Sequence, residues 1–180
     1  MREPTGKRAQ DDPSWYAVYT RSRHEKAVEN SLAAKRFEVF LPLHEVLSQW
    51  KDRKRWVKKP LFPGYLFVRS HGDRLGFVWM EDGVVHVVSD GQGPVPVPEE
   101  QLEPVRQLID RSVPVDPWPY MQEGDRVLVK SGPLIGLEGF FVRRKNQAKL
   151  VVSIHMLGRS VATEVAAGDI EPLEVGAAAQ

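Results

Sequence analysis

The 180-residue sequence contains no cysteine, so this chain has neither a disulfide framework nor a thiolate metal site. It also lacks any run of about 18 apolar residues that could span a bilayer. Its amino terminus, residues 1–8 (MREPTGKR), is polar and lacks the apolar segment of a secretory signal. We therefore expect a cytoplasmic protein with no membrane contact.

Residues that could form a catalytic or metal site are equally sparse. The histidines follow no ligand spacing, and no serine, histidine and acid fall into a known catalytic motif. Those histidines are His24, His44, His71, His86 and His155. Gly91-Gln92-Gly93 lacks the third glycine of a dinucleotide loop and precedes a proline, which favours a turn. We expect no enzyme activity, no cofactor and no metal.

Hydrophobic periodicity predicts an antiparallel α+β fold for the first part of the chain. Residues 15–20, 38–42, 61–68 and 84–88 read as strands because they are rich in aromatic and β-branched residues. Residues 24–37 have the period of an amphipathic helix, and Ser22 with Glu25 predicts a capping box at its start. A second helix is expected within 98–111, starting near Glu103 because Pro104 lacks a backbone donor.

Prolines between residues 113 and 119 predict a division into two domains. The expected ranges are a flexible tail at 1–13, a first domain at 14–112, a linker at 113–120, a second domain at 121–174 and a tail at 175–180. Within the second domain, 124–129, 140–144 and 150–154 read as short strands at regular spacing, which indicates a small β-barrel.

Two clusters in the first domain could bind a partner. The aromatic residues around Pro63-Gly64 are core residues or, with equal weight, the rim of a groove for a partner helix. The run from Lys51 to Lys59, flanked by Trp50 and containing Trp56, is either a solvated hairpin or a surface that neutralises phosphates while an indole stacks on a base. The net charge of +1 does not decide between these interpretations.

The pattern Gly132-Pro133 to Gly139, continuing through Gly158-Arg159 to residues 169–173, resembles a KOW motif. Together with Trp15-Tyr16, residues 24–26, 40–42 and 62–67, it resembles the NusG family of bacterial transcription factors over residues 14–174. The first domain is more similar to specialised paralogues such as RfaH. The resemblance implies an amino-terminal NGN-like domain with an antiparallel sheet and flanking helices, and a carboxyl-terminal SH3-like barrel.

The resemblance also implies partners and binding residues. The first domain would bind the clamp helices of RNA polymerase through Trp15, Tyr16, Phe62 and Tyr65. It would contact DNA at the upstream edge of the transcription bubble through Arg21, Arg23, Lys51, Arg53, Lys54 and Arg55. The KOW domain would bind a small-subunit ribosomal protein or Rho through Leu134, Ile135, Met156 and Leu157.

We thus expect a monomeric elongation factor that modulates pausing, termination and antitermination. Two positions depart from the housekeeping pattern: Asp82 stands where a proline is usual, and Trp79 replaces a basic residue. The alternative is a free RNA-binding or ribosome-associated KOW protein. It would have no use for the Phe62 to Tyr65 groove, and such proteins are usually far more basic.

Overall fold

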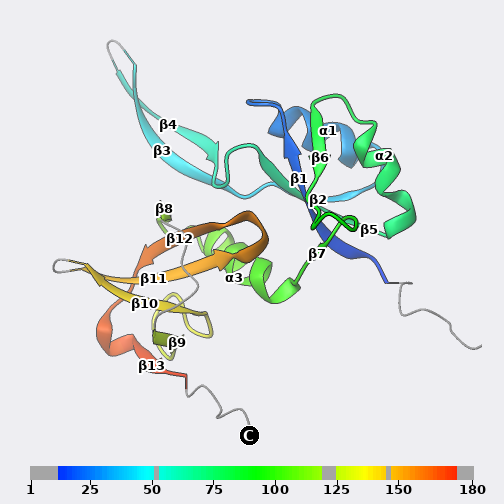
Figure 1. The fold of residues 1–180 in the computed structure, drawn as a ribbon. Coiled ribbons are helices and arrows are strands. Elements are labelled where there is room, and N and C mark those ends of the chain that lie inside the picture. Colours follow the sequence, from blue (N-terminus) through cyan, green and yellow to red (C-terminus); the bar gives the residue numbers. More distant parts are fainter. Residues whose placement is uncertain (1–11, 51–52, 119–124, 145–146, 174–180) are drawn as a thin grey trace, which may run out of the picture. The chain divides into compact units, whose positions relative to one another are not determined.

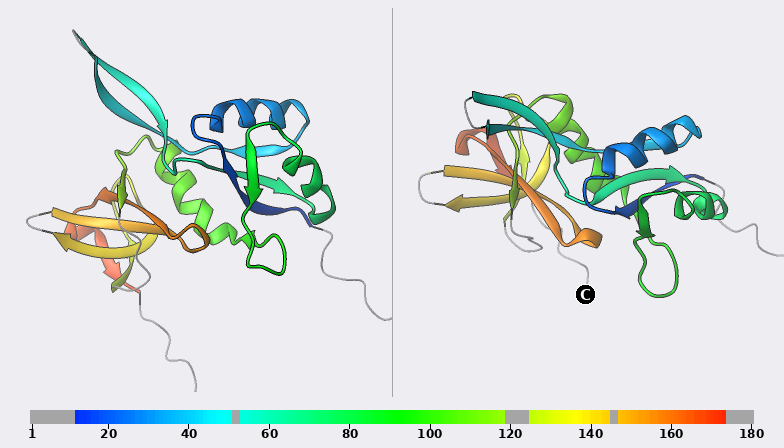
Figure 2. Two further views of the ribbon diagram at one scale, coloured as in Figure 1. Left: turned by 45° about the horizontal axis from the view of Figure 1, so that its top comes forward. Right: turned by 90° about the horizontal axis from the view of Figure 1, so that it is seen from above.

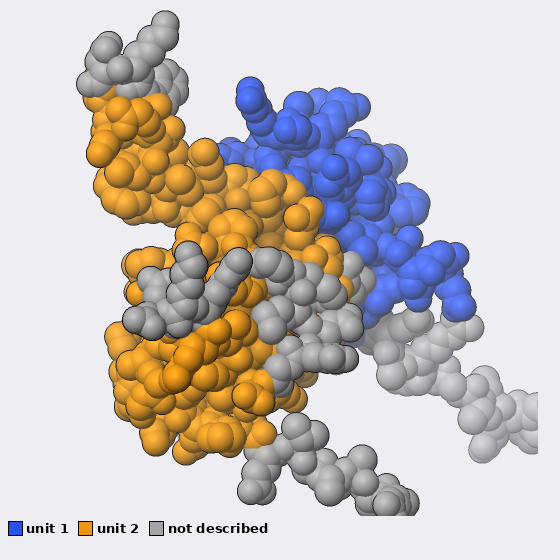
Figure 3. All heavy atoms as spheres, turned by 60° about the vertical axis from the view of Figure 1, so that its left-hand side comes forward, with its two compact units in different colours: residues 1–41, 64–97 blue, residues 42–63, 98–180 orange. Residues whose placement is uncertain are grey.

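The computed structural model describes residues 12–50, 53–118, 125–144 and 147–173. The chain divides into two compact units, coloured separately in Figure 3. Unit 1 comprises residues 1–41 and 64–97, and unit 2 comprises residues 42–63 and 98–180. The expected boundary at 112/113 differs from this division, because residues 42–63 and the segment from 98 onward group with the carboxyl-terminal strands.

Unit 1 is built on an antiparallel sheet with the strand order β2-β5-β1-β6 (Figure 1). Its strands are β1 (Ser14–Thr20), β2 (Glu38–Phe40), β5 (Tyr65–Ser70) and β6 (Val84–Val87), and β7 (Pro96–Val97) also pairs with β1. The helical elements are α1 (Glu25–Ala34), η1 (Gly72–Arg74) and α2 (Leu75–Trp79). Helix α1 lies over one face of the sheet (Figure 2).

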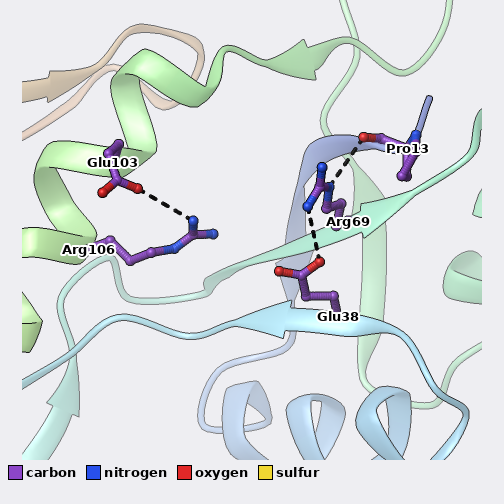
Figure 4. Close-up of polar contacts among 5 residues, drawn as sticks. All are labelled: Pro13, Glu38, Arg69, Glu103 and Arg106. Atoms are coloured by element: carbon purple, nitrogen blue, oxygen red, sulfur yellow. Dashed lines mark hydrogen bonds and ion pairs between the residues drawn. The ribbon is translucent and has the colours of Figure 1, made fainter.

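The core of unit 1 follows from the apolar pattern of its sequence. Val28 and Leu32, four residues apart on α1, are fully buried, as are Ala17 and Val18 on β1. At the sheet edge, the Arg69 guanidinium joins the Pro13 carbonyl to the Glu38 carboxylate (Figure 4). The prediction of a mixed, sheet-rich α+β fold is therefore confirmed for this unit.

The predicted capping box at α1 is wrong. His24, not Ser22, is the N-cap residue, and no side chain caps the helix. Glu25 is the first residue of the helix, and its carboxylate accepts a hydrogen bond from the backbone N–H of Gly64 instead. The Glu25 carboxylate, which the capping box would have used as an acceptor at the start of α1, therefore binds a residue that is distant in the sequence.

Unit 2 contains a two-stranded hairpin, one long helix and a second antiparallel sheet (Figure 1). The hairpin pairs β3 (Leu43–Trp50) with β4 (Arg53–Pro60), and the helix is α3 (Glu99–Asp110). The sheet order is β13-β9-β10-β11-β12-β8. Its strands are β8 (Asp116–Trp118), β9 (Asp125–Val129), β10 (Glu138–Arg144), β11 (Gln147–Ile154), β12 (Arg159–Glu164) and β13 (Ile170–Pro172), with short helices η2 (His155–Leu157) and η3 (Ala167–Asp169).

Helix α3 starts four residues before the expected position, with Pro104 in its interior. The proline removes one backbone hydrogen bond, but Leu102, Val105 and Leu108 are fully buried on one face of the helix, which contacts β11. The burial of three large side chains outweighs the missing bond. An ion pair between Glu103 and Arg106, 3.6 Å apart, spans the helix surface (Figure 4).

Residues 116–118 form strand β8 within the segment expected to be a linker. This strand pairs with β12, and the preceding Val115 is buried. The Thr163 hydroxyl donates a hydrogen bond to the Pro114 carbonyl, 2.8 Å away. The described part of the proline-rich segment is therefore attached to the carboxyl-terminal sheet.

Candidate interaction surfaces

Three ring side chains lie in one row across the sheet of unit 1. Tyr65 on β5 is paired directly with Tyr19 on β1, which is paired with His86 on β6. The ring centroids of Tyr19 and Tyr65 are 5.0 Å apart, and those of Tyr19 and His86 are 5.2 Å apart. The tyrosines are half-buried and His86 is exposed. We call Tyr19, Tyr65 and His86 the aromatic row.

The predicted groove residues do not form one cluster. Trp15 and Tyr16 are buried near the other end of the β1–β5 pairing, opposite Arg69 and Val68. Phe62 belongs to unit 2 and is only 2% exposed. Their burial favours the core interpretation for these three side chains. Of the four predicted residues, Tyr65 alone is half-buried and not buried, and it lies in a row with other rings.

Tyr19 and His86 were not among the predicted site residues. The alternation of side chains along β1 could have placed Tyr19 on a face opposite to Val18. Its juxtaposition with Tyr65 and His86 depends on the strand register, however, which the sequence does not give.

The predicted cationic residues lie in two places. Arg21 and Arg23 are exposed in the loop after β1, where Arg23 has a left-handed backbone conformation with a φ of 65°. Arg21 forms an ion pair of 3.3 Å with Asp82. In this chain a carboxylate therefore competes with any phosphate for Arg21.

Arg53, Lys54 and Arg55 are exposed on β4 of the hairpin, whereas Lys51 lies outside the described residues. Strand pairing places Trp56 opposite Leu47, and Trp56 is 64% exposed. Lys54 and Lys58 share its strand face by alternation. The structure thus places an exposed indole among lysines, beside a hollow of about 330 Å³ that Trp56 and Lys58 help to line.

A buried carboxylate links α1 to the turn before β6. Glu81 accepts hydrogen bonds from the Lys35 ammonium and, at 2.7 Å, from the Ser31 hydroxyl. The bond from Lys35, followed by that from Ser31, lowers the pKa of Glu81 from its ordinary value of 4.5. Glu81 is therefore ionised at neutral pH and ties two segments of unit 1 together.

The predicted KOW docking residues differ in exposure. Ile135 is 56% exposed, whereas Leu134 is buried. Leu157 is half-buried, and the side chain of Met156 lies outside what the structure describes. The Arg111 guanidinium, at the end of α3, donates hydrogen bonds to the carbonyls of Pro133 and Ile135 at 3.0 and 3.1 Å.

Within the described ranges, no three histidine, aspartate or glutamate side chains are grouped so that they could hold a metal ion. No helix in that part of the chain is long and apolar enough to cross a membrane.

Comparison with known proteins assigns the chain to a family. The profile of a family described as transcription termination factor nusG matches residues 13–106, just over half of the chain. A transcription termination/antitermination protein NusG from Deinococcus radiodurans is 31% identical over 184 residues, covering 84% of this chain and 94% of the relative. The chain belongs to the NusG family.

Other relatives agree with this assignment to the NusG family. The NusG protein of Borreliella burgdorferi is 26% identical, covering 89% of this chain and 98% of its own length. A solved structure entitled "Domain interaction in Thermotoga maritima NusG" is 26% identical with a TM-score of 0.54, covering 90% of this chain and 98% of that one. The predictions of a NusG-family transcription factor, and of a protein that is not an enzyme, are confirmed by these relatives.

Proposed function

We propose that this NusG-family protein is an elongation factor that binds RNA polymerase and modulates pausing, termination and antitermination in the cytoplasm. The observation that supports it best is the aromatic row of Tyr19, Tyr65 and His86 on unit 1. Half-exposed tyrosines offer large contact area with little loss of side-chain entropy, and they are frequent anchors of protein interfaces. The polymerase clamp helices, implied by the family resemblance, are the proposed occupant of this surface.

The decisive experiment for this proposal is the Tyr65→Ala substitution in the full-length chain. We expect affinity for RNA polymerase to fall by roughly 30-fold, because a central aromatic anchor contributes about 2 kcal/mol. The measurement is a titration of labelled protein with polymerase, with circular dichroism to verify folding. Trp79→Ala is the matched control, since Trp79 is an exposed aromatic on α2 outside the row. Unchanged affinity for a folded Tyr65→Ala protein would overturn the proposal.

Nucleic-acid contact is the second part of the proposed function. Arg21, Arg23 and the exposed cations of β4 are proposed to meet phosphates of DNA at the upstream edge of the transcription bubble. Support comes from the exposure of Arg53, Lys54 and Arg55 and from the neighbouring Trp56. These contacts would add affinity without reading sequence.

The carboxyl-terminal sheet is proposed to be the KOW domain that couples the factor to a small-subunit ribosomal protein or Rho. Exposed Ile135 and half-buried Leu157 are the proposed contact residues, with Met156 retained from the resemblance. We further propose that the protein acts as a monomer and is a specialised, RfaH-like paralogue.

A free RNA-binding or ribosome-associated KOW protein is the alternative. The aromatic row argues against it, since binding of RNA by the carboxyl-terminal sheet would give these unit 1 side chains no role. The net charge of +1 argues in the same direction.

A further inference from the structure

Glu25 is a carboxylate in the interior of unit 1. It is the first residue of α1, and it is only 6% exposed. Burial of a charged group is costly unless hydrogen bonds compensate it. Its Oε1 atom accepts a hydrogen bond of 2.9 Å from the backbone N–H of Gly64, a residue 39 positions further along the chain. The position at a helix N-terminus favours the negative charge as well.

Hydrogen bonds hold both the N–H group and the carbonyl group of Gly64. While the Gly64 N–H binds Glu25, the Gly64 carbonyl accepts hydrogen bonds from the backbone N–H and hydroxyl of Thr20, at 2.8 and 3.3 Å. Gly64 has a φ of 83°, and a Cβ atom there would lie 2.9 Å from Cε2 of Tyr19. The turn is therefore packed against a ring of the aromatic row, and its backbone orientation is fixed by buried acceptors and donors.

Tyr65 follows Gly64 directly and begins β5. Rotation of the Gly64 peptide would change the direction in which the chain enters the strand, and with it the position of the Tyr65 ring relative to Tyr19. Glu25 thus binds the residue that directly precedes Tyr65, the proposed polymerase anchor.

We infer that Glu25 is a positioning residue: by accepting the Gly64 N–H it sets the geometry of the aromatic row. This inference rests on the proposed function of the row. The required property is an acceptor atom at the correct reach, not the charge. A glutamine supplies the same reach and a carbonyl acceptor, whereas an aspartate keeps the charge but is one methylene too short.

The test compares Glu25→Gln and Glu25→Asp in the full-length protein. We expect Glu25→Asp to weaken polymerase binding about tenfold, the order expected for loss of a buried hydrogen bond at the anchor, and Glu25→Gln to stay within about threefold of the parent. Both variants keep a polar residue that is tolerated in a helix, so both should fold. Glu29→Asp, one turn along α1, is the matched control and should bind like the parent.

Amide NMR provides a readout independent of binding. In Glu25→Asp, the resonances of Gly64 and Tyr65 should shift, and the Gly64 amide should exchange with solvent at least tenfold faster, whereas Glu25→Gln should retain protection. A purely structural role would lower the melting temperature of Glu25→Asp and leave affinity unchanged at temperatures where it is folded. That result, or equal weakening by both substitutions, would overturn the inference.

Failure of the proposed function gives a different pattern. If Tyr65→Ala binds polymerase like the parent, the row is not the docking surface, but the Gly64 and Tyr65 resonances of Glu25→Asp still decide whether Glu25 positions them. If those resonances and the exchange rate do not change, Glu25 has no positioning role, whatever the row binds.

Discussion

Glu81 shows how a single side chain connects parts of unit 1 that are distant in sequence. It receives hydrogen bonds from Ser31 of α1 and from Lys35, the C-cap residue of that helix, although it follows α2 and precedes β6. Its residue is 9% exposed, so the carboxylate has exchanged most of its water for these donors. The arrangement stabilises the ionised form and therefore makes stability depend on pH.

We predict that Glu81→Gln lowers the free energy of unfolding by about 1 kcal/mol at neutral pH, because it removes an ionised acceptor. The pKa of Glu81 is lower in the folded protein than the ordinary 4.5, so its contribution is present above that value. It is lost as the pH falls through the folded pKa. Denaturant titrations of parent and variant should therefore differ at pH 7 and converge at strongly acidic pH.

Glu38→Gln is the matched control for this experiment, since Glu38 pairs with Arg69 at 3.5 Å and its side chain is 57% exposed. Its effect should be close to zero throughout. A Glu81→Gln deficit that stays constant down to acid pH would contradict the linkage.

The exposures of Leu134 and Ile135 could not be predicted from the sequence. Both are apolar and follow the same Gly-Pro turn, so composition cannot assign one to the interior. Their exposures, 5% and 56%, are set by the backbone of the loop, in which the Ile135 N–H bonds the Gly132 carbonyl and Gly136 adopts a φ of 84°. The loop itself was predictable, but the direction of its side chains was not.

The hairpin of β3 and β4 presents cations on both faces. Alternation places Lys54 and Lys58 with Trp56 on one face, and Arg53, Arg55 and Lys59 on the other. In the described part of β3, Glu45 is the sole acidic residue, and it lies opposite Lys58. Such a distribution suits contact with a polyanion along the ribbon, and it also suits simple solvation.

We predict that replacing Arg53, Lys54 and Arg55 with glutamine flattens the salt dependence of nucleic-acid binding. Each lost phosphate contact should reduce the slope of log affinity against log salt by about 0.7 to 0.9. The measurement is fluorescence anisotropy with a labelled oligonucleotide at several salt concentrations.

Lys130→Gln with Arg159→Gln is the control for the hairpin variant, because both are exposed cations away from the hairpin, Lys130 directly after β9 and Arg159 at the start of β12. An identical slope in the hairpin variant and the parent would indicate that these side chains are only solvated. The strands of this hairpin were partly foreseen from the basic run, whereas the placement of Trp56 on one particular face required the register.

At the scale of the whole molecule, the division of the chain differs most from expectation. Helix α3 was assigned to the first domain because it precedes the proline-rich segment, but it groups with the carboxyl-terminal strands. The periodic burial of its apolar face was predictable, whereas the surface that it covers was not, since an amphipathic stripe fits any apolar partner. The family and the α+β character, which rest on local motifs, were predicted correctly.

We predict that a fragment of residues 98–174 is more stable than a fragment of residues 121–174. The longer fragment includes α3, with Leu102, Val105 and Leu108 fully buried, and β8, which pairs with β12. Burial of one such side chain stabilises by about 1.5–3 kcal/mol, so the difference in unfolding free energy should exceed about 3 kcal/mol. Urea titrations monitored by circular dichroism at the two lengths provide the comparison.

Leu102→Asp with Leu108→Asp in the longer fragment should reduce its stability to that of the shorter one. Equal stabilities of the two unmodified fragments would show that α3 does not contribute to the fold of the carboxyl-terminal sheet.

The hydrogen bonds from Arg111 to the carbonyls of Pro133 and Ile135 have a thermodynamic consequence. They make the end of α3 and the loop that exposes Ile135 two coupled sites. Any ligand that binds this loop more tightly once Arg111 has released it must, by reciprocity, weaken the contact of Arg111 with the loop by the same coupling free energy. A ligand that prefers the loop in contact with Arg111 must strengthen that contact by the same amount. Binding at Ile135 would thereby change how firmly the end of α3 is attached to the loop.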